Sequence, residues 1–260
     1  MSTATYDLRQ LHEIEHFDRV YSEEAKSDSL VLHEANIRRY VDPETNTIHS
    51  KEYCYHLMGS LQGKKILEIA CGNGTDTSLM ARLGADVCAY DISPEAIKLT
   101  ENRAAANGLS ERVRTEVSAE FHEAFAGETF DIIVGFAALH HLPLEGLAER
   151  LLCRLNPGGV AVFQEPVVNN RGLARLRQMI PIRVVEVTED EVPLNDESIT
   201  ALAQPFQRIE RREFECVSRI YPFIPYRFLR RALFRLDRAL MHIKPLRRFA
   251  SVVCFGLYRD

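Results

Sequence analysis

The sequence predicts an α/β fold with a doubly wound parallel sheet over residues 63–165. Short apolar runs of strand length alternate there with helical segments, which is the pattern of βαβ units. A glycine-rich turn follows the first run, at the place where such sheets hold their ligands. At 260 residues, with 46% hydrophobic and 27% charged residues, the chain has the composition of a globular protein with a sizeable core.

The segment before the sheet is predicted to be helical at both ends. Residues 8–25 carry apolar side chains at spacings of three, three and four, which form one helical face: Leu11, Ile14, Phe17 and Tyr21. Residues 28–50 are polar and irregular, and a second helix spans about 51–61. We therefore expect residues 1–62 to form a helical cap.

The elements of the sheet region follow in order. The expected strands are 65–70, 85–91, 112–117, 130–136 and 159–165, and the expected helices are 75–83, 93–107 and 144–154. Ser93-Pro94 indicates a helix start, because it is an N-cap followed by proline at the first helical position. Asn107-Gly108 favours the left-handed turn that ends a helix.

Beyond the fifth strand the pattern is less regular. Residues 167–204 contain prolines and the acidic run TEDE, and we interpret them as an insertion that could cover the site as a lid. Residues 205–260 contain a strand-like segment at 208–218 and a final apolar run at 250–258, which we interpret as a strand of the same sheet. This last part is expected to complete the domain whose cofactor-binding core is 63–166.

Between these two segments lies a basic helix, predicted at about 226–242. Its apolar side chains share one face: Phe228, Leu229, Leu233, Leu236 and Leu240. We expect the leucines to pack on the protein's own core, because each gains roughly 1.5–3 kcal/mol by burial. The arginines would then remain on the surface. A peripheral membrane contact is the alternative.

The net charge of −5 is divided unevenly. Residues 205–260 carry 13 basic and 5 acidic side chains, so the remainder carries 19 and 32. A basic end of this kind would suit anionic lipid or an acidic partner, or the acidic remainder of a second copy in a homodimer. The start MSTATYDLRQ has no apolar signal core, and no run approaches about 18 apolar residues. We expect a soluble, cytoplasmic protein with at most a peripheral membrane contact.

The six cysteines include no C-x-x-C pair. Cys71, Cys88, Cys153 and Cys254 lie in or beside apolar runs. We expect them to be small buried hydrophobes rather than zinc ligands or a disulfide framework.

The loop after the first strand is the strongest functional signal. Glycines at 72 and 74 let the backbone approach a ligand, but Thr77 stands where a dinucleotide fingerprint needs its third glycine. Glu68 and Asp76 flank the loop, where they would repel a pyrophosphate and favour a ligand with an ammonium and a sulfonium. Asp91, at the end of the second strand, is placed to accept two ribose hydroxyls. A nicotinamide dehydrogenase is therefore disfavoured. A ligand-free turn, with Asp91 as a helix cap, is the simpler alternative.

Four ordered motifs resemble the class I S-adenosylmethionine-dependent methyltransferases of the small-molecule type. They are LEIACGNGTD, AYDIS, FDIIVGFAALHHL and LNPGGVAVFQEP, and they span about residues 63–166. The resemblance implies a Rossmann-like, seven-stranded sheet with an antiparallel last strand. It also implies S-adenosylmethionine as cofactor and methyl transfer to an O, N or C atom of a small acceptor, which could be apolar. Ala70 departs from the pattern, because the family usually has its first loop glycine there.

The resemblance further implies which residues contact the cofactor. In chain order they are Glu68, Ala70, Gly72, Gly74, Asp91, Ile92, Ser118, Ala119, Glu120, Gly135 and Phe136. Glu68 and the glycine loop would surround the methionine moiety, and Asp91 would hold the ribose. Gly135 and Phe136 would line the sulfonium end, although Phe136 could instead belong to the core. Ser118 stands where the family often has an acid.

Methyl transfer from a sulfonium depends on positioning and on exclusion of water. No His/Cys/carboxylate cluster predicts a metal site, so we expect a metal-free reaction. A neutral hydroxyl acceptor would still need a base, and His140, His141 and Glu165 are the candidates because they follow the fourth and fifth strands. The alternative is that the histidines pack structurally and that Glu165 anchors a loop.

Two further functions were weighed against small-molecule methylation. A nucleic-acid methyltransferase is disfavoured, because GFAALHH rather than an N-P-P-Y-type tetrapeptide follows the fourth strand. We therefore expect no nucleic-acid partner. A protein that binds S-adenosylmethionine on this scaffold without transferring the methyl group remains the alternative.

Overall fold

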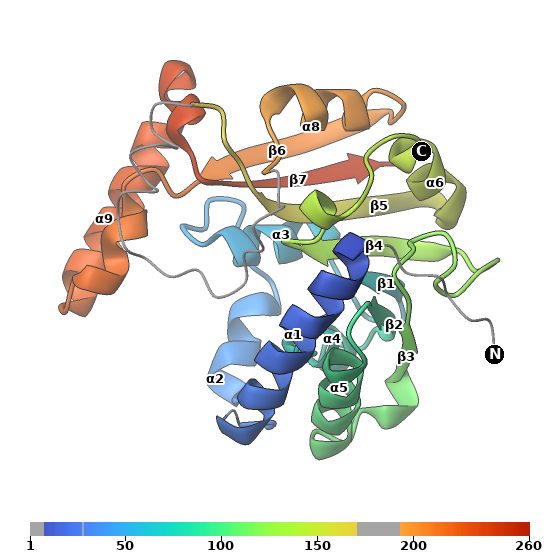
Figure 1. Cartoon of the computed structure of the whole chain (residues 1–260). Coiled ribbons are helices and arrows are strands. Elements are labelled where there is room, and N and C mark those ends of the chain that lie inside the picture. The colour runs from blue at the N-terminus through green and yellow to red at the C-terminus, as the bar shows by residue number, and fades with distance from the viewer. Residues whose placement is uncertain (1–7, 28, 171–192) are drawn as a thin grey trace.

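Seven strands form one mixed sheet in a computed structural model of the chain, which describes residues 8–27, 29–170 and 193–260 (Figure 1). The strands are β1 (Lys65–Ile69), β2 (Asp86–Asp91), β3 (Val113–Val117), β4 (Phe130–Phe136), β5 (Leu155–Pro166), β6 (Arg208–Phe214) and β7 (Val252–Tyr258). Their order is β3-β2-β1-β4-β5-β7-β6. Strands β1 to β5 pair in parallel, whereas β7 is antiparallel to both β5 and β6. The predicted fold class, with its reversed last strand, is confirmed.

The helices lie close to where the sequence predicts them. They are α1 (Leu8–Ser27), α2 (Glu34–Ile37), α3 (Ser50–Met58), α4 (Thr75–Arg82), α5 (Pro94–Ala106), α6 (Leu147–Arg154), α8 (Asp196–Ala203) and α9 (Arg227–Met241). The Ser93 cap is confirmed, since its hydroxyl accepts a hydrogen bond from Ala96 N at 3.1 Å. The short helix α2 lies in the segment that was expected to be irregular. Most of the expected lid, residues 171–192, is outside the described residues.

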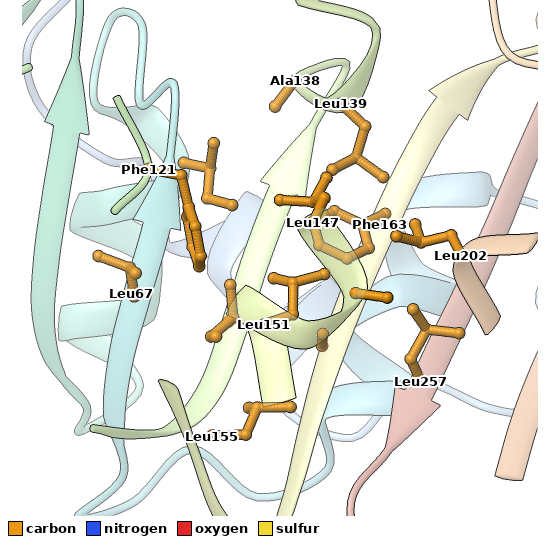
Figure 2. Close-up of a cluster of buried hydrophobic side chains, with 14 of the residues drawn as sticks. Leu67, Phe121, Ala138, Leu139, Leu147, Leu151, Leu155, Phe163, Leu202 and Leu257 are labelled. Atoms are coloured by element: carbon orange, nitrogen blue, oxygen red, sulfur yellow. The ribbon is translucent and has the colours of Figure 1, made fainter. Parts of the chain in front are cut away.

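Two hydrophobic clusters cover the two faces of the sheet. One contains side chains of α3, α4 and α5, and includes Tyr55, Met80 and Ile97. The other lies under α6 and α8, and Figure 2 shows Leu147 and Leu151 of α6 directed at Phe163 and the neighbouring strands. Because both faces are covered, the ligand site is confined to the edge where the parallel strands end.

The terminal helices pack differently from what their apolar stripes predict. Leu11 of α1 is 42% exposed, whereas Glu13 is buried. In α9 the expected burial is wrong for Leu229, which is 42% exposed, and for Leu236, which is 50% exposed, whereas Asp237 is buried. Leu233 and Leu240 are half-buried. The physical reason is that Asp237 accepts hydrogen bonds from three successive backbone N–H groups of residues 216–218, at 3.1, 2.7 and 2.9 Å. The helix therefore packs through the face that carries this carboxylate.

The cysteine prediction needs one correction. Cys71, Cys88 and Cys254 are buried as expected, but Cys153 is exposed, because α6 buries the opposite face with Leu147 and Leu151. All six cysteines are free thiols. Within the described ranges, no helix is long and apolar enough to cross a membrane.

Candidate active site

The glycine loop joins β1 to α4 and is tied to the end of β2. Gly72 N donates to Asp91 Oδ2 at 2.9 Å, and Ser93 N donates to Asp91 Oδ1 at 2.9 Å. Burial raises the pKa of the Asp91 carboxyl, and these backbone donors oppose the shift. The structure therefore brings together the loop and the acid that the sequence singled out. Asp91 also holds the start of α5, which was the simpler alternative for it.

The loop has a left-handed backbone at three positions, with φ of 52° at Ala70, 54° at Gly72 and 73° at Gly74. A Cβ added to Gly74 would lie 2.6 Å from the Thr100 Cα, so close packing against α5 requires that glycine. At Gly72 the Cβ would instead meet the Tyr21 hydroxyl at 2.8 Å. Gly72 thus faces helix α1 rather than α5. Ala70 adopts a conformation that costs less for glycine.

Glu68 is buried at the end of β1 and accepts a hydrogen bond from the Thr77 hydroxyl. Burial, with a smaller contribution from the neighbouring Asp76, raises the pKa of Glu68 to about 8. A cationic group close to it would favour its charged form. An ammonium-bearing ligand therefore fits this acid.

The segment after β3 reaches the same edge of the sheet. Ser118 N donates to the Asp91 carbonyl at 2.9 Å, and the Ser118 hydroxyl accepts from Glu120 N at 3.2 Å. Ser118, Ala119 and Glu120 therefore lie beside Asp91 and Ile92, as a shared ligand would require. Position 118 is a serine rather than an acid, so Glu120 is the carboxylate that this segment offers to a ligand.

The end of β4 supplies the next pair. A Cβ on Gly135 would lie 3.0 Å from the Ala138 Cβ, so this glycine allows the chain to turn tightly after the strand. Phe136 is half-buried and stacks with Tyr55 at 6.3 Å between ring centroids, and Lys51 Nζ lies 4.9 Å from its ring centre. Lys51 also binds Asp76 Oδ2 at 2.6 Å. Asp76 is therefore engaged by this lysine rather than directed at the loop.

Glu165 and His140 form a buried pair after β4 and β5. Glu165 Oε1 accepts from the backbone N–H groups of Ala138 and Leu139 at 2.9 and 2.8 Å, and Oε2 lies 2.8 Å from His140 Nδ1. The carboxylate thus anchors the loop, as the simpler alternative proposed, and also orients the imidazole. Because a carboxylate accepts, Nδ1 is the nitrogen that donates to Glu165, and in a neutral ring the lone pair then belongs to Nε2.

His141 lies directly beside His140, with 4.2 Å between the ring centroids. Its ring also makes an edge contact with Phe17 of α1 at 5.8 Å, and its Nδ1 lies 3.6 Å from Glu13 Oε1. The two histidines therefore share one location but have different carboxylate partners, Glu165 for His140 and Glu13 for His141.

Helix α1 reaches the cofactor loop, which sequence reasoning did not predict. Besides Tyr21 at Gly72, the Asp18 carboxylate accepts hydrogen bonds from Ser93, and Glu24 Oε1 accepts from Asn73 Nδ2 at 2.6 Å. The available signal was the recurrence of these polar side chains on one side of the helix. Tyr21 of the predicted apolar stripe lies on the same side, but the stripe alone does not say which loop the helix contacts.

A cavity of about 310 Å³ opens between α3, β6 and α9. Its lining combines aromatic and basic side chains, among them Tyr40, Lys51, Phe214, Phe234 and Arg238. Lys51 also lies over Phe136, so the cavity begins next to the end of β4. Among the residues described, no three His, Cys, Asp or Glu side chains gather as metal ligands. The expectation of a metal-free reaction stays a prediction.

Comparison with known proteins identifies relatives of this chain. Residues 60–213 match a family described as a methyltransferase domain. Two relatives are named ubiquinone biosynthesis O-methyltransferase. The one from Bordetella avium is 30% identical over 133 residues, which cover 48% of this chain and 55% of that protein. The one from Cereibacter sphaeroides is 37% identical over 103 residues, covering 39% and 40%. The chain thus spans about half the length of the curated relatives it matches.

Solved structures share the fold over nearly the whole chain. Magnesium protoporphyrin IX methyltransferase from Synechocystis PCC 6803, with bound SAH, has a TM-score of 0.55 at 12% identity and covers 96% of this chain and 99% of that one. The N-methyltransferase NodS from Bradyrhizobium japonicum WM9 has a TM-score of 0.55 at 15% identity, covering 94% and 99%. Since the family match covers more than half of the sequence and the sheet order agrees, the chain belongs to the class I S-adenosylmethionine-dependent methyltransferases.

Proposed function

We propose that this chain transfers the methyl group of S-adenosylmethionine to an oxygen, nitrogen or carbon atom of a small acceptor. The observation that carries the proposal is the oriented Glu165–His140 pair, at 2.8 Å, next to the strand end that the family uses for its reacting groups. The names of the relatives favour oxygen. We therefore take a hydroxyl on a quinone-like aromatic ring as the first acceptor to test.

The residues around the glycine loop fit the cofactor. Asp91 would accept the ribose hydroxyls, Glu68 would face the ammonium, and Gly72 would give the backbone its close approach. The cofactor supplies an activated methyl group on a positively charged sulfur. Ser118 and Glu120 would then border the adenine.

His140 would serve as the base for a hydroxyl acceptor. Glu165 holds Nδ1–H, so Nε2 is the atom that can take the acceptor's proton as the new bond forms. Glu165 is a positioning residue here rather than a base, because both of its oxygens already accept hydrogen bonds. His141, which lies beside Phe17, would border the cofactor instead.

The acceptor would enter from the cavity that begins at Lys51. Aromatic side chains such as Tyr40 and Phe234 would contact an apolar ring, and the basic ones would bind a negative or polar substituent. We propose that residues 1–62 cover the cofactor side and that 205–260 complete the same domain and shape the acceptor side. A lid formed by 167–204 stays a prediction.

The test is methylation with radiolabelled S-adenosylmethionine and a panel of quinols, phenols, amines and lipids. In His140→Asn, kcat should fall about 10²- to 10⁴-fold while cofactor affinity is kept. In Glu165→Gln, kcat should fall by a similar factor. The glutamine amide would donate to Nδ1, so the proton of the ring would be on Nε2. The double variant should be no worse than either single variant, since the two side chains act as one unit.

A matched control is His33→Asn, which changes an exposed histidine directly before α2. It should leave kcat unchanged. Full activity in His140→Asn would remove the base assignment. Cofactor binding without transfer to any acceptor of the panel would instead favour the alternative, a binding protein on this scaffold.

A further inference from the structure

Helix α9 has two faces of opposite character, and only one of them packs on the protein. The packed face contains Asp237, Met241 and Phe234. Asp237 binds three backbone N–H groups, and the Phe234 ring contacts Tyr221 at 5.7 Å and His49 at 5.2 Å. This face carries the buried contacts of the helix, which lies at the periphery of the molecule in Figure 1.

The other face is apolar and exposed. Phe228 is 69%, Leu236 50% and Leu229 42% exposed, and the segment just before the helix adds Phe223 at 65% and Tyr226 at 60%. Together with Leu233 these side chains form the "apolar face". All of them except Phe228, which contacts Tyr226, line a groove of about 470 Å³. Single exposed hydrophobic residues are ordinary on protein surfaces, but a continuous patch of this kind marks an interaction site.

Arginines border the apolar face. By helical periodicity Arg227, Arg231 and Arg235 follow one another along the side next to Phe228, and all three are exposed. In the part of the chain that the structure describes, none of them forms an ion pair. Residues 205–260, which include them, carry 13 basic and 5 acidic side chains.

We propose that α9, with residues 223–226, docks on the surface of an anionic lipid bilayer. The aromatic and leucine side chains would enter the interface between headgroups and acyl chains, and the arginines would contact lipid phosphates. Aromatic side chains beside a row of arginines on an amphipathic helix are the chemistry that such an interface binds. A protein groove, or the acidic remainder of a second copy, would need acidic residues opposite these arginines, and a second copy docked α9 against α9 would bring the same positive row against itself.

Docking in this way has a consequence for the cavity. Phe234, Asp237 and Arg238 line the cavity of about 310 Å³ and belong to α9 itself. Because Phe234 and Asp237 lie on the packed face, the bilayer would lie on the other side of the helix, roughly 10 Å from the cavity. The docking itself goes beyond the proposed function and does not depend on it.

Vesicle flotation with the full chain tests the proposal. We expect binding to vesicles of phosphatidylcholine mixed with phosphatidylglycerol, and much weaker binding to phosphatidylcholine alone. Arg227→Gln/Arg231→Gln/Arg235→Gln should lower the partition coefficient on the order of a hundredfold, at about fivefold for each basic residue. Phe223→Ser/Phe228→Ser should lower it about tenfold or more, because the inserted apolar area is lost.

Matched controls change the same types of residue elsewhere on the surface. Arg38→Gln/Lys64→Gln/Lys98→Gln removes three exposed charges, and Val31→Ser/Val41→Ser removes two side chains that are 55% and 63% exposed. Both should bind as the unaltered chain does. Circular dichroism of all variants checks the fold.

Three results would overturn the proposal. The first is no flotation at low salt, and the second is equal loss in the control variants. The third is a dimer in solution that dissociates in Phe223→Ser/Phe228→Ser without any vesicle binding, because the apolar face would then belong to a second copy. Methyl transfer is not measured in any of these assays, so their outcome is separate from that of the proposed activity.

Discussion

Helices α1 and α9 both lie outside the sheet, yet they contact the molecule in different ways. Helix α1 places Asp18, Tyr21 and Glu24 against the start of α5 and the glycine loop. Helix α9 packs through the face of the buried carboxylate Asp237 and leaves Leu229 and Leu236 exposed. In α1 the apolar stripe and the polar contacts share one face, whereas in α9 a polar contact with backbone groups, rather than the apolar stripe, decides which face packs. The unused apolar face of α9 is then available for another surface.

The largest effect is expected from removing the carboxylate that seats α9. Asp237→Ala should lower the free energy of unfolding by about 3 kcal/mol, because buried backbone donors lose a charged acceptor. Urea denaturation measures this change in the free energy of unfolding. The neighbouring Leu236→Ala removes an exposed side chain and should cost no more than about 0.5 kcal/mol. Equal costs for the two variants would mean that the leucine stripe, not the carboxylate, holds the helix.

The cofactor side should show a pH dependence. The pKa of Glu68 is about 8 in the folded chain, above its ordinary 4.5. Its contribution to stability is therefore complete below about pH 4.5 and is lost as the pH rises through about 8. A bound ammonium would favour the charged form, so cofactor affinity should rise up to about tenfold per pH unit below pH 8.

Calorimetry in buffers of different ionisation enthalpy measures the accompanying release of a proton. Glu68→Gln should abolish both the proton release and the slope. A slope that persists in Glu68→Gln would assign the linkage to another group.

The contact of α1 with α5 should contribute less. Asp18→Ala removes the acceptor of the Ser93 hydroxyl and Glu95 N–H, and should cost about 1 kcal/mol. Limited proteolysis should then cut residues 8–27 faster, and bound cofactor should protect them. Asp42→Ala, which changes an exposed acid elsewhere in the amino-terminal segment, serves as the control. Unchanged proteolysis in Asp18→Ala would show that α1 is held by its apolar contacts instead.

The smallest effect concerns the loop beneath α1. Ala70 has a φ of 52°, so Ala70→Gly should relieve left-handed strain. Because glycine also loses more entropy on folding, the net gain in unfolding free energy should be only about 0.5–1 kcal/mol. Ala81→Gly, in the interior of α4, should have the opposite sign. A loss of stability in Ala70→Gly would show that the loop is not strained at this position.

The sequence predicts the sheet well because its signals are local. Alternating strands and helices, the Ser93 cap and the stop at Gly108 depend on neighbouring residues, and each is confirmed. The approach of Asp91 to the glycine loop also follows from topology, since parallel strands end at one edge. The roles of the individual site residues stay predictions.

The remaining features depend on partners that are distant along the chain. Asp237 packs because backbone donors of residues 216–218 lie beneath it, and nothing in the helix itself marks this. Likewise Glu165 accepts hydrogen bonds from the loop after β4, about 25 residues earlier in the chain. In the sequence this acid is a candidate base, and nothing near it in the sequence indicates these contacts. Hydrophobic periodicity therefore does not predict the burial of charged side chains that bind distant backbone groups.

The position of β7 determines when the sheet can be completed during synthesis. Strand β7 lies between β5 and β6, although it is the last strand in the sequence. During synthesis β1 to β5 can pair as soon as they emerge, whereas β6 has no neighbour until residues 252–258 follow. Helix α9 is synthesised within that interval, with its aromatic side chains uncovered before the sheet closes. Encounters with lipid, with chaperones or with other nascent chains would fall in this interval, when an incomplete sheet edge is most prone to wrong pairing.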